Sequence, residues 1–97
     1  MSQWSHDMSV ARTMTSPRGR YQEGTMRAIL ENYIHNSAAM EARITRHTAS
    51  AIAFRNGFVR VRTDAQAALA DVAVKSRMAP HVTRILHDCY ACHARFR

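Results

Sequence analysis

The scarcity of helix-breaking residues is the feature that most constrains the fold of this chain. Its 97 residues include only three glycines and two prolines, and neither residue type occurs between Gly24 and Gly57. Glycine and proline are the residues least compatible with a helix interior, whereas alanine, arginine and methionine, all frequent here, favour helix. Because a chain of this length forms one small domain, we expect a single all-α domain.

Apolar residues recur at helical spacing in the first half of the chain. Ser16 and Pro17 suit the N-cap and the first position of a helix that we predict over residues 17–44. Its larger apolar residues follow in steps of three and four, with Ser37 in the one gap, so they share one face of the helix. They are Met26, Leu30, Tyr33, Met40 and Ile44. Residues 1–15 show no clear period, which predicts a loose N-terminal arm.

The stretch "ITRHTAS" is the best candidate for a break after this helix. Threonine disfavours a helix interior, and Thr48 or Ser50 could cap the next helix, which we expect over residues 49–61.

The rest of the chain contains two further helix starts. Thr63 and Gln66 match the S/T-x-x-E/Q capping box, which predicts the start of a third helix. Pro80 is suited to the first position of a fourth helix, over residues 80–97. Four helices with short connections predict an antiparallel four-helix bundle over residues 16–97.

The chain ends in "DCYACHARFR", which contains both cysteines in the pattern C-x-x-C-H. This pattern is the attachment signature for c-type haem. Two thiols on one helical turn can form thioethers with the two vinyl groups of the porphyrin, and the adjacent histidine can then serve as the proximal iron ligand. The motif therefore predicts one covalent haem c, tethered at Cys89 and Cys92, with iron bound by His93.

The motif also lies on an apolar stripe of the last predicted helix. The residues of this stripe are Val82, Ile85, Leu86, Cys89, Cys92, His93 and Phe96. We therefore expect both thiols and the imidazole to face inward, with the haem inside the bundle.

Three other interpretations of the cysteines stay open. Cysteine is often simply a small buried hydrophobic residue. Zinc would need a further ligand, such as His87 or a distant histidine, because the sequence has no second C-x-x-C and no H-x-x-x-H. A thioredoxin-like dithiol would be expected within a βαβ pattern, which this chain lacks.

The ending "CYACHARFR" resembles the C-terminal signature of class II c-type cytochromes, the cytochrome c prime family. The segment "RYQEGTMRAILENYIHNSAAMEARI" is similar to the first helix of that family. The likeness covers residues 20–44 and 81–97. It implies a four-helix bundle with thioethers at Cys89 and Cys92 and with His93 as the proximal ligand.

The same resemblance implies that Met26 lies on the distal side of the haem. As a sixth ligand, Met26 would give a six-coordinate iron suited to electron transfer. As a packing residue, it would leave a five-coordinate iron able to bind nitric oxide or carbon monoxide. Arg18 or Arg20 would pair with a haem propionate. The resemblance implies electron transfer or gas binding, and we expect no enzymatic turnover of a substrate.

Covalent haem attachment ordinarily takes place outside the cytoplasm, so the haem hypothesis predicts a periplasmic protein. The first ten residues, "MSQWSHDMSV", contain no apolar core typical of an export signal. No run of about 18 apolar residues occurs either, so we expect no transmembrane segment.

The chain carries 14 lysines and arginines against seven acidic residues, a formal net charge of +7. Such a charge attracts anionic partners: an acidic redox protein, nucleic acid or an anionic membrane surface. The apolar stripes would also allow a homodimer.

A haem-free alternative follows from a second likeness. "LENYI" followed by "RHTASAI" resembles a core histone, in which Arg43 and Arg46 would contact phosphates. A third class is a basic helical subunit of a larger assembly, in which Cys89 and Cys92 have no chemical role.

Overall fold

The computed structural model describes residues 2–96, and the side chains of residues 3–95. The described residues form four α-helices and no strand, so the predicted all-α four-helix bundle is confirmed. The helices are α1 (Ser2–Thr15), α2 (Glu23–Arg43), α3 (Ala49–Ala70) and α4 (Lys75–Phe96). None of them is long and apolar enough to cross a membrane.

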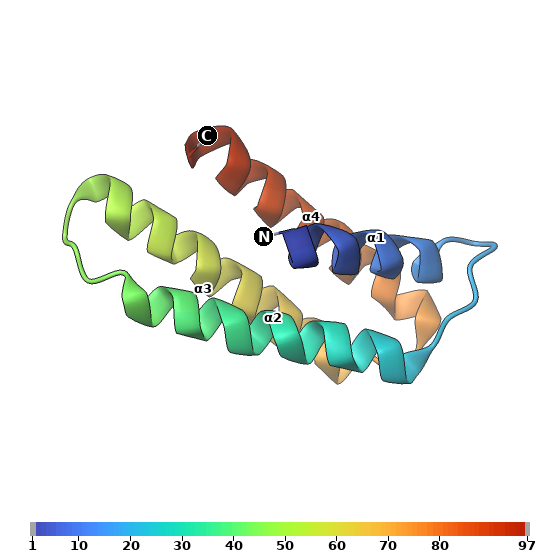
Figure 1. Cartoon of the computed structure of the whole chain (residues 1–97). Helices are drawn as coiled ribbons and strands as arrows, with labels where there is room; N and C mark the ends of the chain where they lie inside the picture. The colour runs from blue at the N-terminus through green and yellow to red at the C-terminus, as the bar shows by residue number, and fades with distance from the viewer. Residues whose placement is uncertain (1, 97) are drawn as a thin grey trace.

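Each helix runs roughly antiparallel to the one it packs against most closely (Figure 1). The α2 and α3 helices form a long hairpin, α4 returns along α3, and α1 packs against α4 and α2. The connections over residues 16–22 and 71–74 meet at one end of the bundle, which we call the loop end. The cysteines lie toward the other end of α4, which we call the cysteine end.

The first helix corrects the prediction of a loose arm over residues 1–15. From Ser2 to Thr15 the chain is helical, and one face of this helix is buried in the core. The buried apolar residues of α1 are Trp4, Met8, Ala11 and Met14, in steps of four and three. The Tyr33 hydroxyl of α2 donates a hydrogen bond to the Trp4 carbonyl at 2.6 Å, which fixes α1 to α2.

Ser16 and Pro17 do not start a helix, because α2 begins only at Glu23. The Ser16 hydroxyl instead donates to the Thr13 carbonyl at 2.7 Å and so closes the end of α1. The connection then folds back on α1 so closely that a Cβ atom at Gly19 would lie 1.8 Å from the Thr13 oxygen. This turn therefore requires glycine.

The predicted apolar face of α2 is confirmed. Met26, Leu30, Tyr33 and Ser37 are buried in the core, and Met40 and Ile44 pack against it.

The predicted break near residues 44–48 is also confirmed. Thr48 is the N-cap of α3, and its hydroxyl accepts a hydrogen bond from the Ala51 amide at 3.1 Å.

The capping box at Thr63 and Gln66 starts no helix, since α3 continues without interruption from Ala49 to Ala70. The surrounding alanine-rich sequence favours continued helix over a new start. Helix α3 also tolerates Gly57, which is buried against α4.

Helix α4 begins at Lys75, five residues earlier than predicted, so Pro80 lies inside the helix. Proline at this position cannot donate to the carbonyl of Ser76. Because Ser76 is exposed, water can satisfy that carbonyl, and the helix accommodates the proline.

Candidate functional site

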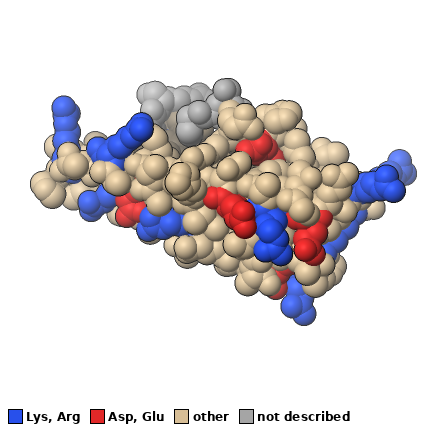
Figure 2. All heavy atoms as spheres, turned by 60° about the horizontal axis from the view of Figure 1, so that its bottom comes forward, with Lys and Arg blue, Asp and Glu red and all other residues tan. Residues whose placement is uncertain are grey.

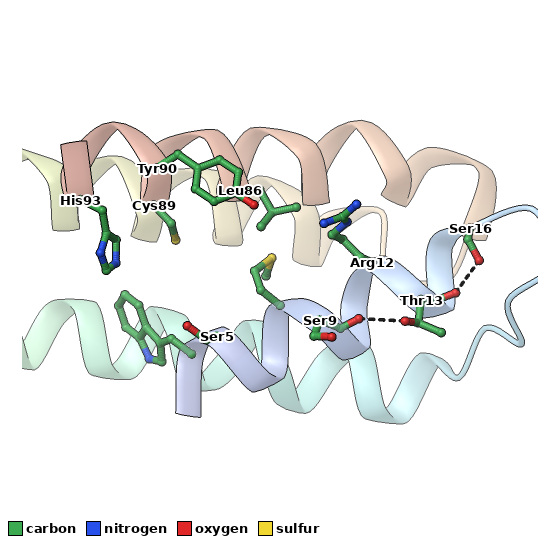
Figure 3. Close-up of a pocket in the computed structure, with 11 residues that line it drawn as sticks. Ser5, Ser9, Arg12, Thr13, Ser16, Leu86, Cys89, Tyr90 and His93 are labelled. Carbon is green, nitrogen blue, oxygen red and sulfur yellow. Dashed lines mark hydrogen bonds between the residues drawn. The ribbon is translucent and has the colours of Figure 1, made fainter. Parts of the chain in front are cut away.

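A cavity of about 710 Å³ lies between α1 and the C-terminal half of α4 (Figure 3). Its lining residues are Trp4, Ser5, Met8, Ser9, Arg12, Thr13, Ser16, Leu86, Cys89, Tyr90 and His93. A volume of this order is typical of pockets that enclose a small molecule or cofactor.

The α4 wall of the cavity carries two residues of the C-x-x-C-H motif. Steps of three and four along a helix return to the same face, which aligns Leu86, Cys89 and His93. Figure 3 shows the side chains of Cys89 and His93 extending from α4 toward α1. Tyr90 lies beside them at the mouth of the cavity and is 62% exposed.

Cys92 lies one turn beyond Cys89 and faces α3. A Cβ atom at Gly57 would be 3.6 Å from the Cys92 Sγ, an ordinary contact distance. Cys92 lines a smaller space, whose walls also include Cys89 and His93. The structure therefore brings the two thiols and the imidazole together where α1, α3 and α4 meet.

The apolar stripe of α4 is only partly turned inward. Val82 and Ile85 are buried, Cys89 and Cys92 are half-buried, and His93 is exposed. The side chain of Phe96, which we assigned to the same stripe, lies outside the described part of the chain.

The expectation that both thiols and the imidazole face into the bundle is therefore corrected: they lie at its edge, and His93 is exposed. The interior is already filled by aromatic side chains. Trp4 packs edge-on against Tyr33, with ring centroids 4.7 Å apart, and against Phe58, with centroids 6.2 Å apart. Cys92 contacts α3 at Gly57, and the cavity lies on the side of α4 that faces α1.

Both thiols lie in surroundings that favour the neutral form. Burial raises the pKa of Cys89 to about 11, with smaller contributions from Asp88 and Cys92. Burial also raises the pKa of Cys92, although Arg60 acts in the opposite direction. Thiol–disulfide exchange requires a thiolate, so these surroundings do not favour a dithiol redox role.

The described residues do not provide the ligands that a zinc site would need. Among the described residues, no cluster of three or more His, Cys, Asp or Glu side chains is arranged to hold a metal ion. His87, the nearest candidate in the sequence, is exposed.

Met26 is not brought to the cavity. Its side chain is fully buried in the core, and it is not one of the lining residues. It lies in the first turn of α2 at the loop end, whereas Cys89 and His93 lie at the cysteine end (Figure 1). The methionine that does line the cavity, opposite the α4 wall, is Met8 of α1.

Met8 is not among the predicted site residues, because the sequence predicts a loose arm over residues 1–15. The signal was present: Trp4, Met8 and Ala11 follow in steps of four and three. Polar residues between them, and the small size of alanine, make this apolar face inconspicuous.

Arg12 is the only Lys or Arg among the described residues that line the cavity. Arg18 and Arg20, which the resemblance suggested as propionate partners, are exposed in the connection after α1 and do not line it. On the face shown in Figure 2, Asp and Glu lie among the Lys and Arg residues.

A pair of carboxyl groups lies beside the cysteines, between α3 and α4. Burial raises the pKa of Asp88 to about 7, and the hydrogen bond and charge of Asp64 act in the same direction. Arg60 and Arg84 oppose this rise. One oxygen of Asp88 is buried without a hydrogen-bond partner among the described residues.

Comparisons with known proteins add no identification: no family model, no curated protein and no solved structure matches this chain.

Proposed function

We propose that this chain is a c-type haem protein, with thioethers at Cys89 and Cys92 and His93 as the proximal iron ligand. Its function would be one-electron transfer, binding of a diatomic gas, or both, without turnover of a substrate. The observation that supports the proposal is that Cys89 and His93 line a cavity of about 710 Å³, while Cys92 lies next to them around a smaller space whose walls also include Cys89 and His93.

The residues around this cavity fit a flat, largely apolar ligand. Trp4, Met8 and Leu86 supply apolar surface on both walls. The protonated thiols form no disulfide, so both sulfurs remain available for thioether bonds. Haem, when bound, supplies a one-electron iron couple whose potential depends on the axial ligands and on burial.

Met8 replaces Met26 as the residue that would decide between the two functions. A thioether ligand from Met8 would favour electron transfer, because His/Met ligation is characteristic of electron-transfer cytochromes. If Met8 only packs against the haem, the iron has an open position for nitric oxide or carbon monoxide.

The proposed function also bears on the partner, the oligomeric state and the compartment of the protein. A net charge of +7 suits an acidic redox partner, and the open edge of the bundle would allow a homodimer. Covalent attachment implies maturation in a periplasmic compartment.

The decisive experiment is expression with an export signal in a host that contains haem-ligation machinery. We expect a coloured protein whose haem resists extraction with acidified acetone. Cys89→Ala and Cys92→Ala together should abolish retention, whereas His93→Ala should keep covalent haem with altered iron ligation. His87→Ala, an exposed histidine on the same helix, is the matched control and should behave like the unmodified protein.

A colourless product from this host would contradict the proposal. Binding of that product to duplex DNA, with an affinity that falls steeply as salt rises, would instead support the histone-like alternative. Carbon monoxide added to the reduced coloured protein distinguishes gas binding, which changes the absorption spectrum, from a closed six-coordinate iron.

A further inference from the structure

A buried glycine in the interior of a helix lies opposite one of the two thiols. Gly57 belongs to the middle of α3, it is buried, and it faces the Cys92 sulfur of α4. Glycine makes a helix interior less stable than alanine does, because it loses more backbone freedom on folding. Helix stability therefore does not explain the glycine at this position.

Neither the backbone nor the packing requires glycine at position 57. No glycine among the described residues has a positive φ, so other residues can adopt the backbone conformation of Gly57. Outside the backbone of its own helix, a Cβ atom would meet only the Cys92 Sγ at 3.6 Å and an Arg60 guanidinium nitrogen at 4.0 Å, both ordinary contact distances. Alanine would therefore fit without displacing α4, in contrast to Gly19, where a Cβ atom would lie 1.8 Å from a backbone oxygen.

The glycine instead leaves space beside the Cys92 sulfur. Gly57 and Cys92 both line the smaller space where α1, α3 and α4 meet, which has a volume of about 20 Å³. A space of this size admits one group about as large as a water molecule. Its other walls include Trp4, Phe58 and Val61, so it suits a small hydrocarbon group better than water, which needs several polar partners. A methyl group at position 57 would take up part of this space.

This space determines how a reacting group reaches Cys92, whose thiol does not line the cavity between α1 and α4. When a thiol adds across a carbon–carbon double bond, the S–H bond and the π bond break, an S–C bond forms, and the thiol proton goes to the second carbon. The addition therefore needs room for one alkene carbon beside the sulfur. We infer that Gly57 keeps the Cys92 sulfur open to a small alkene on the side that faces α3, and so permits a second covalent bond beside the one at Cys89.

The use of this access for a second thioether rests on the proposed haem function, but the access itself can be tested without haem. Acrylamide is a suitable probe, because it is a small vinyl compound that alkylates thiols by the same addition. The full-length chain without haem is reduced and treated with acrylamide at alkaline pH, which increases the fraction of thiolate. Fragmentation of the modified peptide in a mass spectrometer then gives the rate at each cysteine. Cys89 is the internal reference, since it is not among the atoms that a Cβ at Gly57 would meet.

We expect Gly57→Ala to lower the ratio of the alkylation rate at Cys92 to that at Cys89 by about tenfold, because overfilling a small space raises a barrier by this order. The resistance of this variant to urea should be unchanged or higher, because alanine favours a helix interior. Gly24→Ala is the matched control, an exposed glycine of α2 at which a Cβ atom meets nothing within 4 Å. It should leave the ratio unchanged.

Three outcomes would overturn the inference. An unchanged ratio in Gly57→Ala would mean that Gly57 does not control access to Cys92. A lower urea midpoint of this variant would mean that packing requires the glycine. Reaction of the unmodified chain at Cys89 alone would mean that the space gives no access to Cys92. Acrylamide addition does not depend on haem, so a colourless product from the haem-ligating host would overturn the proposed function and leave the role of Gly57 standing.

Discussion

The loop end and the cysteine end of the bundle are held in different ways. At the loop end, Tyr21 and Lys75 donate hydrogen bonds to the carbonyls of Val72 and Gly19, which joins the two connections. Asp71 also bonds to His81 at 2.8 Å. At the cysteine end, Tyr90 and His93 are exposed beside the cavity. Hydrogen bonds between connections therefore hold the loop end, whereas the cysteine end contains a cavity between α1 and α4.

This difference shows how a small bundle can combine stability with a binding site. Polar contacts between connections fix the relative positions of helices without filling the space between them. Apolar burial then needs to be complete only over part of the length of each helix. At the cysteine end, the aromatic cluster of Trp4, Tyr33 and Phe58 packs next to the cavity, and Trp4 also lines it.

The largest expected effect compares two side chains of α4. Met78 is fully buried and Leu86 forms part of the cavity wall. Met78→Ala should lower the free energy of unfolding by about 2–5 kcal/mol, whereas Leu86→Ala should cost less than about 2 kcal/mol, because its site is already partly open. Urea denaturation measures both. Equal losses would mean that the cavity wall contributes as much stability as the core.

The next effect concerns the turn that joins α1 to α2. Gly19→Ala would place a Cβ atom against the Thr13 carbonyl and should destabilise the protein by about 1–3 kcal/mol. Gly24→Ala is the control, because a Cβ atom at that position meets nothing within 4 Å, and alanine there should be neutral or stabilising by up to about 1 kcal/mol. If both variants unfold at the same urea concentration, the turn does not constrain the loop end.

A smaller effect is expected from the hydrogen bond between the two connections. Tyr21→Phe leaves the Val72 carbonyl without this donor and should cost about 1 kcal/mol. Tyr90→Phe at the cysteine end removes an exposed hydroxyl and should change the stability by no more than about 0.5 kcal/mol. Thermal unfolding of the two variants measures this difference in stability. If Tyr21→Phe unfolded at the same temperature as the unmodified chain, the hydrogen bond to Val72 would not contribute to stability.

The smallest effect is a difference in pH dependence between the two ends. The pKa of Asp88 is raised from its ordinary 3.8 to about 7, so the folded state holds its proton more tightly than the unfolded state does. The Asp88 contribution to stability is therefore fully present below pH 3.8 and is lost as the pH rises to about 7. Asp88→Asn should remove this dependence, an effect below about 1 kcal/mol because solvent screens the half-buried pair with Asp64.

Asp71 at the loop end should show the opposite sign. The hydrogen bond from His81 lowers the pKa of Asp71, and the charges of His81 and Arg77 act in the same direction. Its contribution to stability is present at neutral pH and is lost as the pH falls through the lowered pKa. Urea midpoints of Asp71→Asn and Asp88→Asn between pH 3 and pH 8 separate the two cases. If both variants changed the pH dependence of stability in the same direction, the opposite pKa shifts of Asp71 and Asp88 would be contradicted.

Much of the fold could be predicted from the sequence where one helix face is strongly apolar. The run from Met26 to Tyr33 has this property, and the break before Thr48 coincides with residues that favour caps. Helix starts were less predictable, because Ser16, Thr63 and Pro80 all match capping patterns. Such patterns are local, and in the structure none of the three residues starts a helix.

Some residues of the candidate site can likewise be predicted from the sequence, and others cannot. Cys89, Cys92 and His93 can be recognised from the sequence because they form one short motif, C-x-x-C-H. Met8 and Arg12 are not, since they reach the cavity only after α1 has packed against α4. A residue whose role depends on the contact between two distant segments belongs to no short motif. The resemblance implied Met26 instead, which is buried in the core at the loop end.

The position of Trp4 has a consequence for experiment. It is the only tryptophan of the chain, and it belongs both to the buried aromatic cluster and to the cavity wall. Its intrinsic fluorescence is therefore a built-in optical probe of two separate events. A light-absorbing ligand in the cavity would quench the emission by energy transfer without shifting it. Unfolding would expose the indole to water and shift the emission to longer wavelength, so one residue would report occupancy and folding independently.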